Sequence, residues 1–377
     1  MKSPSARSTG LLVCVLSLLL VACGGVKNPE GWATPGLNGD RTYFFPASDR
    51  LAGVTLGADG SVIKAWQFPD KTHPEQKDAG FKASYGVSLA GDALYFGSWN
   101  GRLYSVSASD GALRWGGPNI VSGGIVGEPV VSGDRVFVGT TDGQLHAFAT
   151  SNGAPAPGWP SGGVKLPAAI WAAPVVSGGK VFVATMGGAI YALQQADGSM
   201  AWPEPFKIDG AIPDLALLDD GRLFVPGLNK QVFIVSTADG KAIGPGFPTD
   251  EWVWSRPAFR DGVAYFGDFS GKVYALDITT SPMTAKWTAD LTDKIKATPV
   301  LIDGVLVVGT RKPSVAFIDA QTGAIQNTVV LTDAGTIRAG LVAHAGRALI
   351  ATTDGKLFDA DPKTRAANLL NVVGAKP

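Results

Sequence analysis

The most specific chemical signal in this chain is at Cys23. This residue follows an apolar run from Leu11 to Val21 and stands in the sequence Leu20-Val21-Ala22-Cys23-Gly24. The pattern resembles a bacterial lipobox, whose cysteine receives lipid such as palmitate and becomes the new N-terminus. The run is shorter than the roughly 20 residues that cross a bilayer, and it has the length of a signal-peptide core. We therefore expect residues 1–22 to be removed as a lipoprotein signal peptide and Cys23 to anchor the chain to a membrane.

Other reactive residue types form no catalytic pattern. The chain has 3 histidines and 2 cysteines, and Cys14 lies in the segment expected to be removed. His73, His146 and His344 have no metal-ligand spacing to one another or to a cysteine. No nucleophile elbow or phosphate-binding loop occurs. We interpret His146 as a partly buried strand residue, and we predict no enzyme activity, no metal site and no cofactor.

Composition and charge exclude further classes. Of the 377 residues, 45% are hydrophobic and only 17% are charged, unlike a disordered chain. Lysine plus arginine and aspartate plus glutamate each number 32, so the basic excess of a nucleic-acid-binding protein is missing. A chain of this length exceeds one ordinary domain of roughly 100–200 residues unless it is a repeat protein or a large barrel.

The elements that position any site come from an internal repeat. A unit of about 42 residues, clearest at Gly133-Asp134-Arg135-Val136-Phe137-Val138-Gly139, recurs along the chain. Its eight copies begin at Gly39, Gly91, Gly133, Gly179, Gly221, Gly262, Gly304 and Gly346. Each copy holds short apolar strands separated by tight turns such as Asp142-Gly143, the pattern of a four-stranded propeller blade. We predict an all-β fold: a single eight-bladed β-propeller of four-stranded antiparallel blades over residues 31–377, preceded by a lipidated tether over 23–30.

A large side chain recurs near the outer strand of each copy. Five copies place tryptophan there, at Trp66, Trp115, Trp159, Trp202 and Trp287. The others place Phe247, Val329 and Leu369 near that position. We expect these residues to pack one blade against the next.

The segments that lead into the inner strands contain the candidate binding residues. Trp32, Trp171 and Trp254 each precede a proline by three residues, and Lys296 takes the same place before Pro299. Small residues beside them suit a crowded propeller axis. The candidate partner-binding residues are Trp171, Trp252, Trp254, Arg256, Lys296 and Arg338. Aromatic and cationic side chains of this kind often dominate interfaces. Alternatively, the tryptophans plug the channel or wedge between blades, and the partner binds the opposite face or the polar insertion from Asp70 to Gly80.

The repeat resembles a known family. One unit contains, in succession, the patterns Pro-Val-Val, Gly-Asp-x-Val-Phe-Val-Gly-Thr-x-Asp-Gly and Gly-x-x-x-Trp. This succession is similar to the pyrroloquinoline-quinone-type propeller repeat. Together with the lipobox, it resembles the BamB family of outer-membrane assembly lipoproteins. That resemblance implies a periplasm-facing scaffold that binds the central assembly protein and assists β-barrel insertion. Quinoprotein dehydrogenases share the repeat but carry adjacent disulfide-bonded cysteines, which the chain after residue 22 lacks.

Two functions from different classes remain open. The first is a membrane-tethered scaffold for protein–protein interaction, most concretely a BamB-like component of outer-membrane assembly. The second is an exported binding protein for a small molecule or surface polymer, without turnover. We expect a protein partner such as the β-barrel assembly machinery, a membrane contact through the lipid, no nucleic acid, and a monomer within a complex. The expected location is the cell envelope, on the outer membrane facing the periplasm if the host has two membranes.

Overall fold

The computed structural model describes residues 34–39, 42–47, 50–57, 62–76, 79–82 and 86–370. Cys23, the signal peptide, the tether and Trp32 lie outside these residues, so the expectations about them stay predictions. Within the described residues, no helix is both long enough and apolar enough to pass through a membrane.

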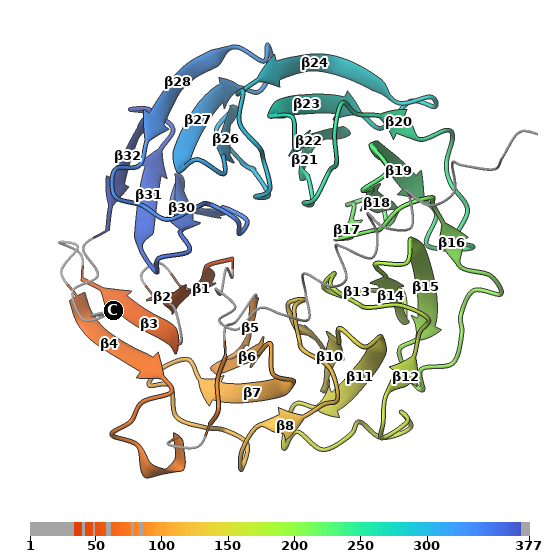
Figure 1. The fold of residues 1–377 in the computed structure, drawn as a ribbon, viewed down its shortest axis with the longest axis vertical. Coiled ribbons are helices and arrows are strands. Elements are labelled where there is room, and N and C mark those ends of the chain that lie inside the picture. Colours follow the sequence, from red (N-terminus) through yellow and green to blue (C-terminus); the bar gives the residue numbers. More distant parts are fainter. Residues whose placement is uncertain are drawn as a thin grey trace, which may run out of the picture.

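Eight four-stranded antiparallel sheets stand around one axis, and in each sheet the strands follow chain order from the axis outward (Figure 1). Blade 1 contains β1 (Gly36–Asn38), β2 (Thr42–Ala47), β3 (Arg50–Leu56) and β4 (Val62–Phe68). Blade 2 contains β5 (Val87–Ala90), β6 (Ala93–Gly97), β7 (Arg102–Ser107) and β8 (Asn119–Ile120). Blade 3 contains β9 (Val130–Ser132), β10 (Arg135–Gly139), β11 (Gln144–Ala149) and β12 (Val164–Lys165). Blade 4 contains β13 (Val175–Ser177), β14 (Lys180–Ala184), β15 (Ala189–Gln194) and β16 (Phe206–Lys207).

The second half of the ring repeats this arrangement. Blade 5 contains β17 (Ala216–Leu217), β18 (Leu223–Pro226), β19 (Gln231–Val235) and β20 (Phe247–Pro248). Blade 6 contains β21 (Ala258–Arg260), β22 (Val263–Gly267), β23 (Lys272–Asp277) and β24 (Thr284–Asp290). Blade 7 contains β25 (Val300–Ile302), β26 (Val305–Gly309), β27 (Ser314–Asp319) and β28 (Ile325–Val330). Blade 8 contains β29 (Val342–His344), β30 (Arg347–Ala351), β31 (Leu357–Asp361) and β32 (Ala366–Leu369). The predicted eight-bladed propeller is confirmed.

The middle strands of the blades are apolar on both faces. Along β10, Val136, Phe137 and Val138 are all 0% exposed, although successive side chains of a strand point in opposite directions. Each blade packs between two neighbours, so both of its faces are buried. This explains why the repeat shows continuous apolar runs rather than strict alternation.

The five repeat tryptophans join consecutive blades, as predicted. Each indole Nε1 donates a hydrogen bond to a backbone carbonyl of the next blade: Trp66 to Ala108 at 3.1 Å, Trp115 to Thr150 at 3.1 Å, Trp159 to Gln195 at 2.9 Å, Trp202 to Thr237 at 3.1 Å and Trp287 to Ala320 at 2.9 Å. The rings of these tryptophans lie against a turn glycine of that next blade. At Gly153, for example, φ is +75° and a Cβ would lie 2.8 Å from Trp115 Cδ2. The turn therefore requires glycine both for its backbone conformation and for the space that the indole ring occupies.

The copies without this tryptophan differ among themselves. Phe247 of blade 5 contacts Tyr274 of blade 6, with ring centroids 6.2 Å apart. Val329 of blade 7 packs against the cluster that blades 7 and 8 share. Leu369 of blade 8 is 47% exposed, so its predicted packing role was wrong. It lies on the outermost strand β32 and faces solvent.

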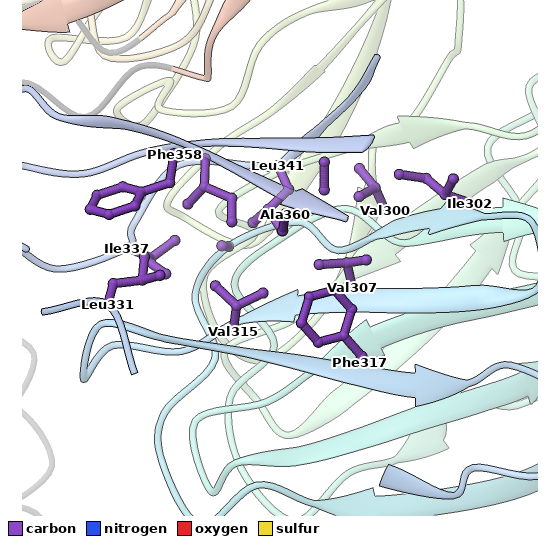
Figure 2. Packing of buried hydrophobic residues seen from close by; sticks show 13 residues of the cluster. Val300, Ile302, Val307, Val315, Phe317, Leu331, Ile337, Leu341, Phe358 and Ala360 are labelled. Atoms are coloured by element: carbon purple, nitrogen blue, oxygen red, sulfur yellow. The ribbon is translucent and has the colours of Figure 1, made fainter. Parts of the chain in front are cut away.

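The interfaces between blades form the core of the protein. Figure 2 shows one of them, where Phe317 of β27 and Phe358 of β31 belong to a single buried cluster. Blade 8 packs against blade 1 through a cluster that includes Leu349 and Val54. Each sheet consists of four consecutive strands, so blades 8 and 1 meet through side chains and not through an exchanged strand.

The polar insertion between blades 1 and 2 is attached to the ring. It contains a short 3-10 helix, η1 (Pro74–Gln76). Gln76 is 2% exposed, and its Nε2 donates a hydrogen bond to the carbonyl of Gly111 at 3.1 Å. The amide of Asp70 donates to Gln76 Oε1 at 2.8 Å, which holds the start of the insertion against the same side chain.

Candidate functional site

The segments that lead into the inner strands are fixed by a buried aliphatic residue. The amide of Ile170 donates to the carbonyl of Thr140 in the preceding blade at 2.9 Å, and Ile212 and Ile295 make the same type of bond. Gly139 leaves room for this residue, because a Cβ there would lie 2.2 Å from Ile170 Cγ2. We call Ile170, Ile212 and Ile295 the aliphatic anchors. The three residues after each anchor pass close to the propeller axis in a fixed register.

These segments enclose a cavity of about 210 Å³. It is lined from blade 3 through blade 8, with Thr34 of the segment before blade 1 completing the wall. The aromatic and charged residues that line it are Glu128, Trp171, Asp214, Trp254, Arg256, Lys296 and Arg338. Most of the other lining residues are small or apolar, so these seven side chains determine its chemistry.

An aromatic row runs from the cavity to the surface. Trp171 and Trp254 lie 6.3 Å apart between ring centroids, at an interplanar angle of 59°. Trp254 stacks on Phe269 at 5.9 Å and 15°, and Phe269 in turn contacts Trp252 at 6.2 Å. Lys294 Nζ lies 5.9 Å from the centre of the Phe269 ring. The row extends across blades 4 and 6, and Lys294 adds a cation from the segment before blade 7.

One side of the cavity holds a mixed charge cluster. Arg256 Nε donates to Asp214 Oδ1 at 2.9 Å, and this carboxylate raises the pKa of the guanidinium. Burial raises the pKa of Glu128, an effect that Arg256 opposes and Asp214 reinforces. Arg256 therefore has acidic neighbours, and this side of the cavity carries no excess of positive charge.

The inner segments of blades 7 and 8 contribute basic residues to the wall, Lys296 and Arg338. Lys296 Nζ lies 4.2 Å from the centre of the Trp254 ring, a cation–π distance. Burial, together with the charges of Arg338 and Arg311, lowers the pKa of Lys296 to about 7. A lysine pKa falls in this way where the ammonium is poorly hydrated and its charged neighbours are also cations.

The structure brings together five of the six residues predicted as binding residues. Trp171, Trp254, Arg256, Lys296 and Arg338 all line the cavity, whereas Trp252 does not. It lies two residues before Trp254 and contacts that ring only through Phe269. Trp171 and Trp254 both form part of the cavity wall.

Sequence reasoning missed Asp214 and left Glu128 out of the site. The alignment on a proline fails in blade 5, where Ala216 occupies the proline position. Counting instead from the aliphatic anchors Ile212 and Ile295 would have placed Asp214 on the channel wall. The same count shows that Arg338 corresponds to Lys296.

The histidines take no part in this site. His146 on β11 is 6% exposed and stacks on Phe148 at 5.7 Å, and burial lowers its pKa. It is a strand residue, as interpreted, and it is more deeply buried than the partly buried position that we expected. Within the described residues, no three His, Cys, Asp or Glu side chains are grouped so that they could hold a metal ion.

The fold and its repeats define the class of this protein as an eight-bladed propeller with pyrroloquinoline-quinone-type repeats. The chain belongs to the family described as outer membrane protein assembly factor BamB, whose model matches residues 55–156, 156–281 and 244–367. No curated protein sequence gives a significant match.

Solved structures show the same fold. The crystal structure of BamB from Moraxella catarrhalis is 19% identical to this chain, covers 87% of it and 93% of its own length, and superposes with a TM-score of 0.68. The computationally designed Ika8 protein is 13% identical, covers 88% and 96%, and gives a TM-score of 0.70. At these identities the likeness establishes the fold alone.

Proposed function

We propose that this protein is a lipid-anchored scaffold of the outer membrane, facing the periplasm, that binds the β-barrel assembly machinery without catalysing a reaction. The observation that carries the proposal is the BamB family match, which spans all but the ends of the propeller. The lipobox at Cys23 supplies the anchor, and the absence of a nucleophile–base pair in the sequence agrees with a role in binding.

The partner surface lies on the propeller face where the aromatic row reaches solvent. We call Trp252, Phe269, Lys294 and Arg311 the mouth patch. The amide of Phe269 donates to the carbonyl of Trp252 at 3.0 Å, and that of Arg311 to the carbonyl of Lys294 at 2.8 Å, so the four residues are adjacent. Lys294 and Arg311 are exposed, while the two rings are partly buried. A rigid aromatic base with cations at its rim is a typical hot-spot composition.

The anchor is tested by replacing the lipidated residue. Cys23→Ser should release the protein from membranes and leave an unprocessed or soluble form, because no acyl chains hold it. Gly24 is not aspartate, so we expect the wild-type protein in the outer-membrane fraction. Fractionation with wild-type protein as the control checks this prediction. A Cys23→Ser protein that stays membrane-bound without lipid would contradict it.

The mouth patch is tested by affinity for the purified periplasmic region of the host's barrel-assembly protein. Replacing Trp252 and Lys294 together by alanine should weaken binding about 30-fold, which corresponds to about 2 kcal/mol for hot-spot residues. Met200→Ala is the matched control, since Met200 is 52% exposed outside the patch. Circular dichroism confirms folding of each variant.

One further variant helps to locate the contact. Replacing Trp254 and Arg256 together by alanine should also weaken binding if the partner reaches into the channel. Equal affinity in the folded Trp252/Lys294 variant and in wild type would exclude the mouth patch and move the search to the opposite face or the insertion after Asp70.

A further inference from the structure

The turn between β22 and β23 of blade 6 contains a carboxylate, Asp268, that is 0% exposed. The same position, directly after the second strand of the blade, holds a threonine in four other blades: Thr140, Thr185, Thr310 and Thr352. A buried carboxylate is costly unless hydrogen bonds satisfy both of its oxygens. The presence of a carboxylate instead of a hydroxyl therefore needs a reason beyond closing the turn.

One oxygen of Asp268 closes its own turn. Oδ1 accepts hydrogen bonds from the backbone amides of Ser270 at 2.9 Å and Lys272 at 3.1 Å, and from the Ser270 hydroxyl at 2.5 Å. Threonine has the same role in blade 3, where the hydroxyl of Thr140 accepts from the amide of Gln144 at 3.0 Å. This oxygen therefore takes the place of the threonine hydroxyl.

The second oxygen reaches out of the turn to the segment that carries Trp252. Oδ2 accepts a hydrogen bond from the backbone amide of Glu251 at 3.0 Å and another from the Tyr274 hydroxyl at 2.9 Å. The Tyr274 oxygen in turn accepts from the amide of Asp250 at 2.9 Å. Two consecutive amides of the segment are thus bound, directly or through one hydroxyl, to a single carboxylate. A threonine has one side-chain oxygen, which the turn already uses, so we expect it to leave Glu251 without this partner.

These bonds hold the backbone on both sides of Trp252. Glu251 directly precedes it, and the carbonyl of Trp252 accepts from the amide of Phe269, the residue after Asp268, at 3.0 Å. The Trp252 and Phe269 rings lie 6.2 Å apart at an interplanar angle of 46°. Both side chains are only partly buried, so packing fixes them less firmly than it fixes a core residue. The direction of the Trp252 ring therefore depends on the backbone bonds that the blade 6 turn provides.

We propose that Asp268 is a positioning residue for the mouth patch, whose second oxygen holds the Trp252 segment in the conformation that binds the partner. The inference rests on the proposed function and deepens it, because it identifies what keeps the aromatic half of the patch in place. A partner that meets a preorganised ring does not have to order that ring on binding, and this improves the affinity.

Three variants separate this role from closure of the turn. Asp268→Thr gives blade 6 the residue of the other blades and removes the oxygen that reaches Glu251. Asp268→Asn is the second variant if Asp268→Thr does not fold: its carbonyl oxygen can stay in the turn, while its NH₂ group would meet the amide of Glu251, donor against donor. Thr140→Val is the matched control, because it removes the turn hydroxyl at the same position of blade 3, which does not contribute to the mouth patch.

Hydrogen–deuterium exchange of the full-length protein in detergent, read by mass spectrometry, tests the hold without a partner. In Asp268→Thr, the amides of residues 250 and 251 should exchange at least about tenfold faster than in wild type, the factor that about 1.4 kcal/mol of lost local stability gives. Peptides from blades 2–4 should keep their wild-type rates. In Thr140→Val, the peptide that contains residues 250 and 251 should exchange as in wild type. An unchanged rate for this peptide in folded Asp268→Thr and Asp268→Asn proteins would overturn the proposal.

Affinity for the purified periplasmic region of the barrel-assembly protein shows whether the hold acts through Trp252. Asp268→Thr should weaken binding about three- to tenfold, the cost of ordering one or two side chains. Once Trp252 is replaced by alanine, Asp268→Thr should change the affinity by less than about twofold, because no ring is left to position. A merely structural role predicts the same loss in both backgrounds, and that result would overturn the proposal.

This inference and the proposed function fail in different ways. A Trp252→Ala protein that binds the partner as tightly as wild type would refute the mouth patch, and with it a role of Asp268 in binding. A weaker Trp252→Ala protein, combined with wild-type exchange or wild-type affinity in Asp268→Thr, would leave the mouth patch standing and refute the role of Asp268 alone.

Discussion

Truncation of one interblade tryptophan should destabilise the whole ring, and Trp202→Ala is the sharpest case. Trp202 is 3% exposed between blades 4 and 5, and its ring lies 5.3 Å from that of Phe182. Its Nε1 donates to the carbonyl of Thr237 at 3.1 Å. The turn glycine beneath it, Gly240, is so close that a Cβ there would lie 2.7 Å from the indole ring. Alanine would leave a cavity at this contact and an unpaired carbonyl.

The magnitude follows from those contacts. Removing a buried tryptophan side chain costs about 3–5 kcal/mol in free energy of unfolding, and one lost hydrogen bond accounts for about 1 kcal/mol of it. Trp202→Phe keeps most of the ring and loses the hydrogen bond, so we expect about 1–2 kcal/mol. Met200→Ala, at a position two residues away that is 52% exposed, should change stability by less than about 0.5 kcal/mol.

Equilibrium unfolding in urea, followed by far-ultraviolet circular dichroism, measures these differences. Because each core cluster is shared by two blades, the transition should remain a single step in all three variants. If Trp202→Ala lowered the free energy of unfolding by less than about 1 kcal/mol, the interpretation that these tryptophans hold consecutive blades together would be refuted. A second unfolding transition of the Trp202→Ala protein at a lower urea concentration would refute the prediction that the ring unfolds as one cooperative unit.

Two further predictions concern a turn and a titration. Gly153→Ala should lower the free energy of unfolding by about 1–3 kcal/mol, because φ at Gly153 is +75° and the new Cβ would meet the Trp115 ring. Gly116→Ala is the control, since a Cβ at Gly116 would have nothing within 4 Å. Thermal unfolding compares the two variants, and equal Tm values would contradict this prediction. The pKa of Lys296 is about 7 in the folded protein, whereas the ordinary value for lysine is 10.5. Between pH 7 and pH 10.5 the unfolded chain therefore binds a proton at this residue that the folded chain does not. The free energy of unfolding should rise with pH across this range. The Lys296→Met protein should lack that rise, and it should be more stable than wild type below pH 7. Urea unfolding of both proteins at pH 6 and pH 9 measures the difference. The same change in stability with pH in wild type and variant would count against the lowered pKa of Lys296.

The repeat could be recognised from the sequence because its signals are local. Each unit of about 42 residues repeats turn glycines and short apolar strands, and five units have a tryptophan in or shortly before the outer strand. Each unit therefore specifies its own blade, and eight copies specify the ring. The five tryptophans could be assigned to interblade contacts without coordinates, since the period gives each of them the same neighbours. Leu369 failed this reasoning because it was aligned by position alone, although its side chain faces solvent.

The eight-bladed propeller and the existence of a channel set of aromatic and cationic residues thus followed from the sequence alone, whereas the lipobox at Cys23 stays a prediction. The tertiary structure decided which of these residues meet. Asp214 and Arg256 are 42 residues apart and form an ion pair only because consecutive blades place them side by side at the axis. Trp252 and Trp254 are neighbours in the chain, yet only Trp254 lines the cavity. The set of residues that line the cavity has the same origin: it depends on how inner segments from different blades converge on one axis, and no pattern within a single repeat contains that information.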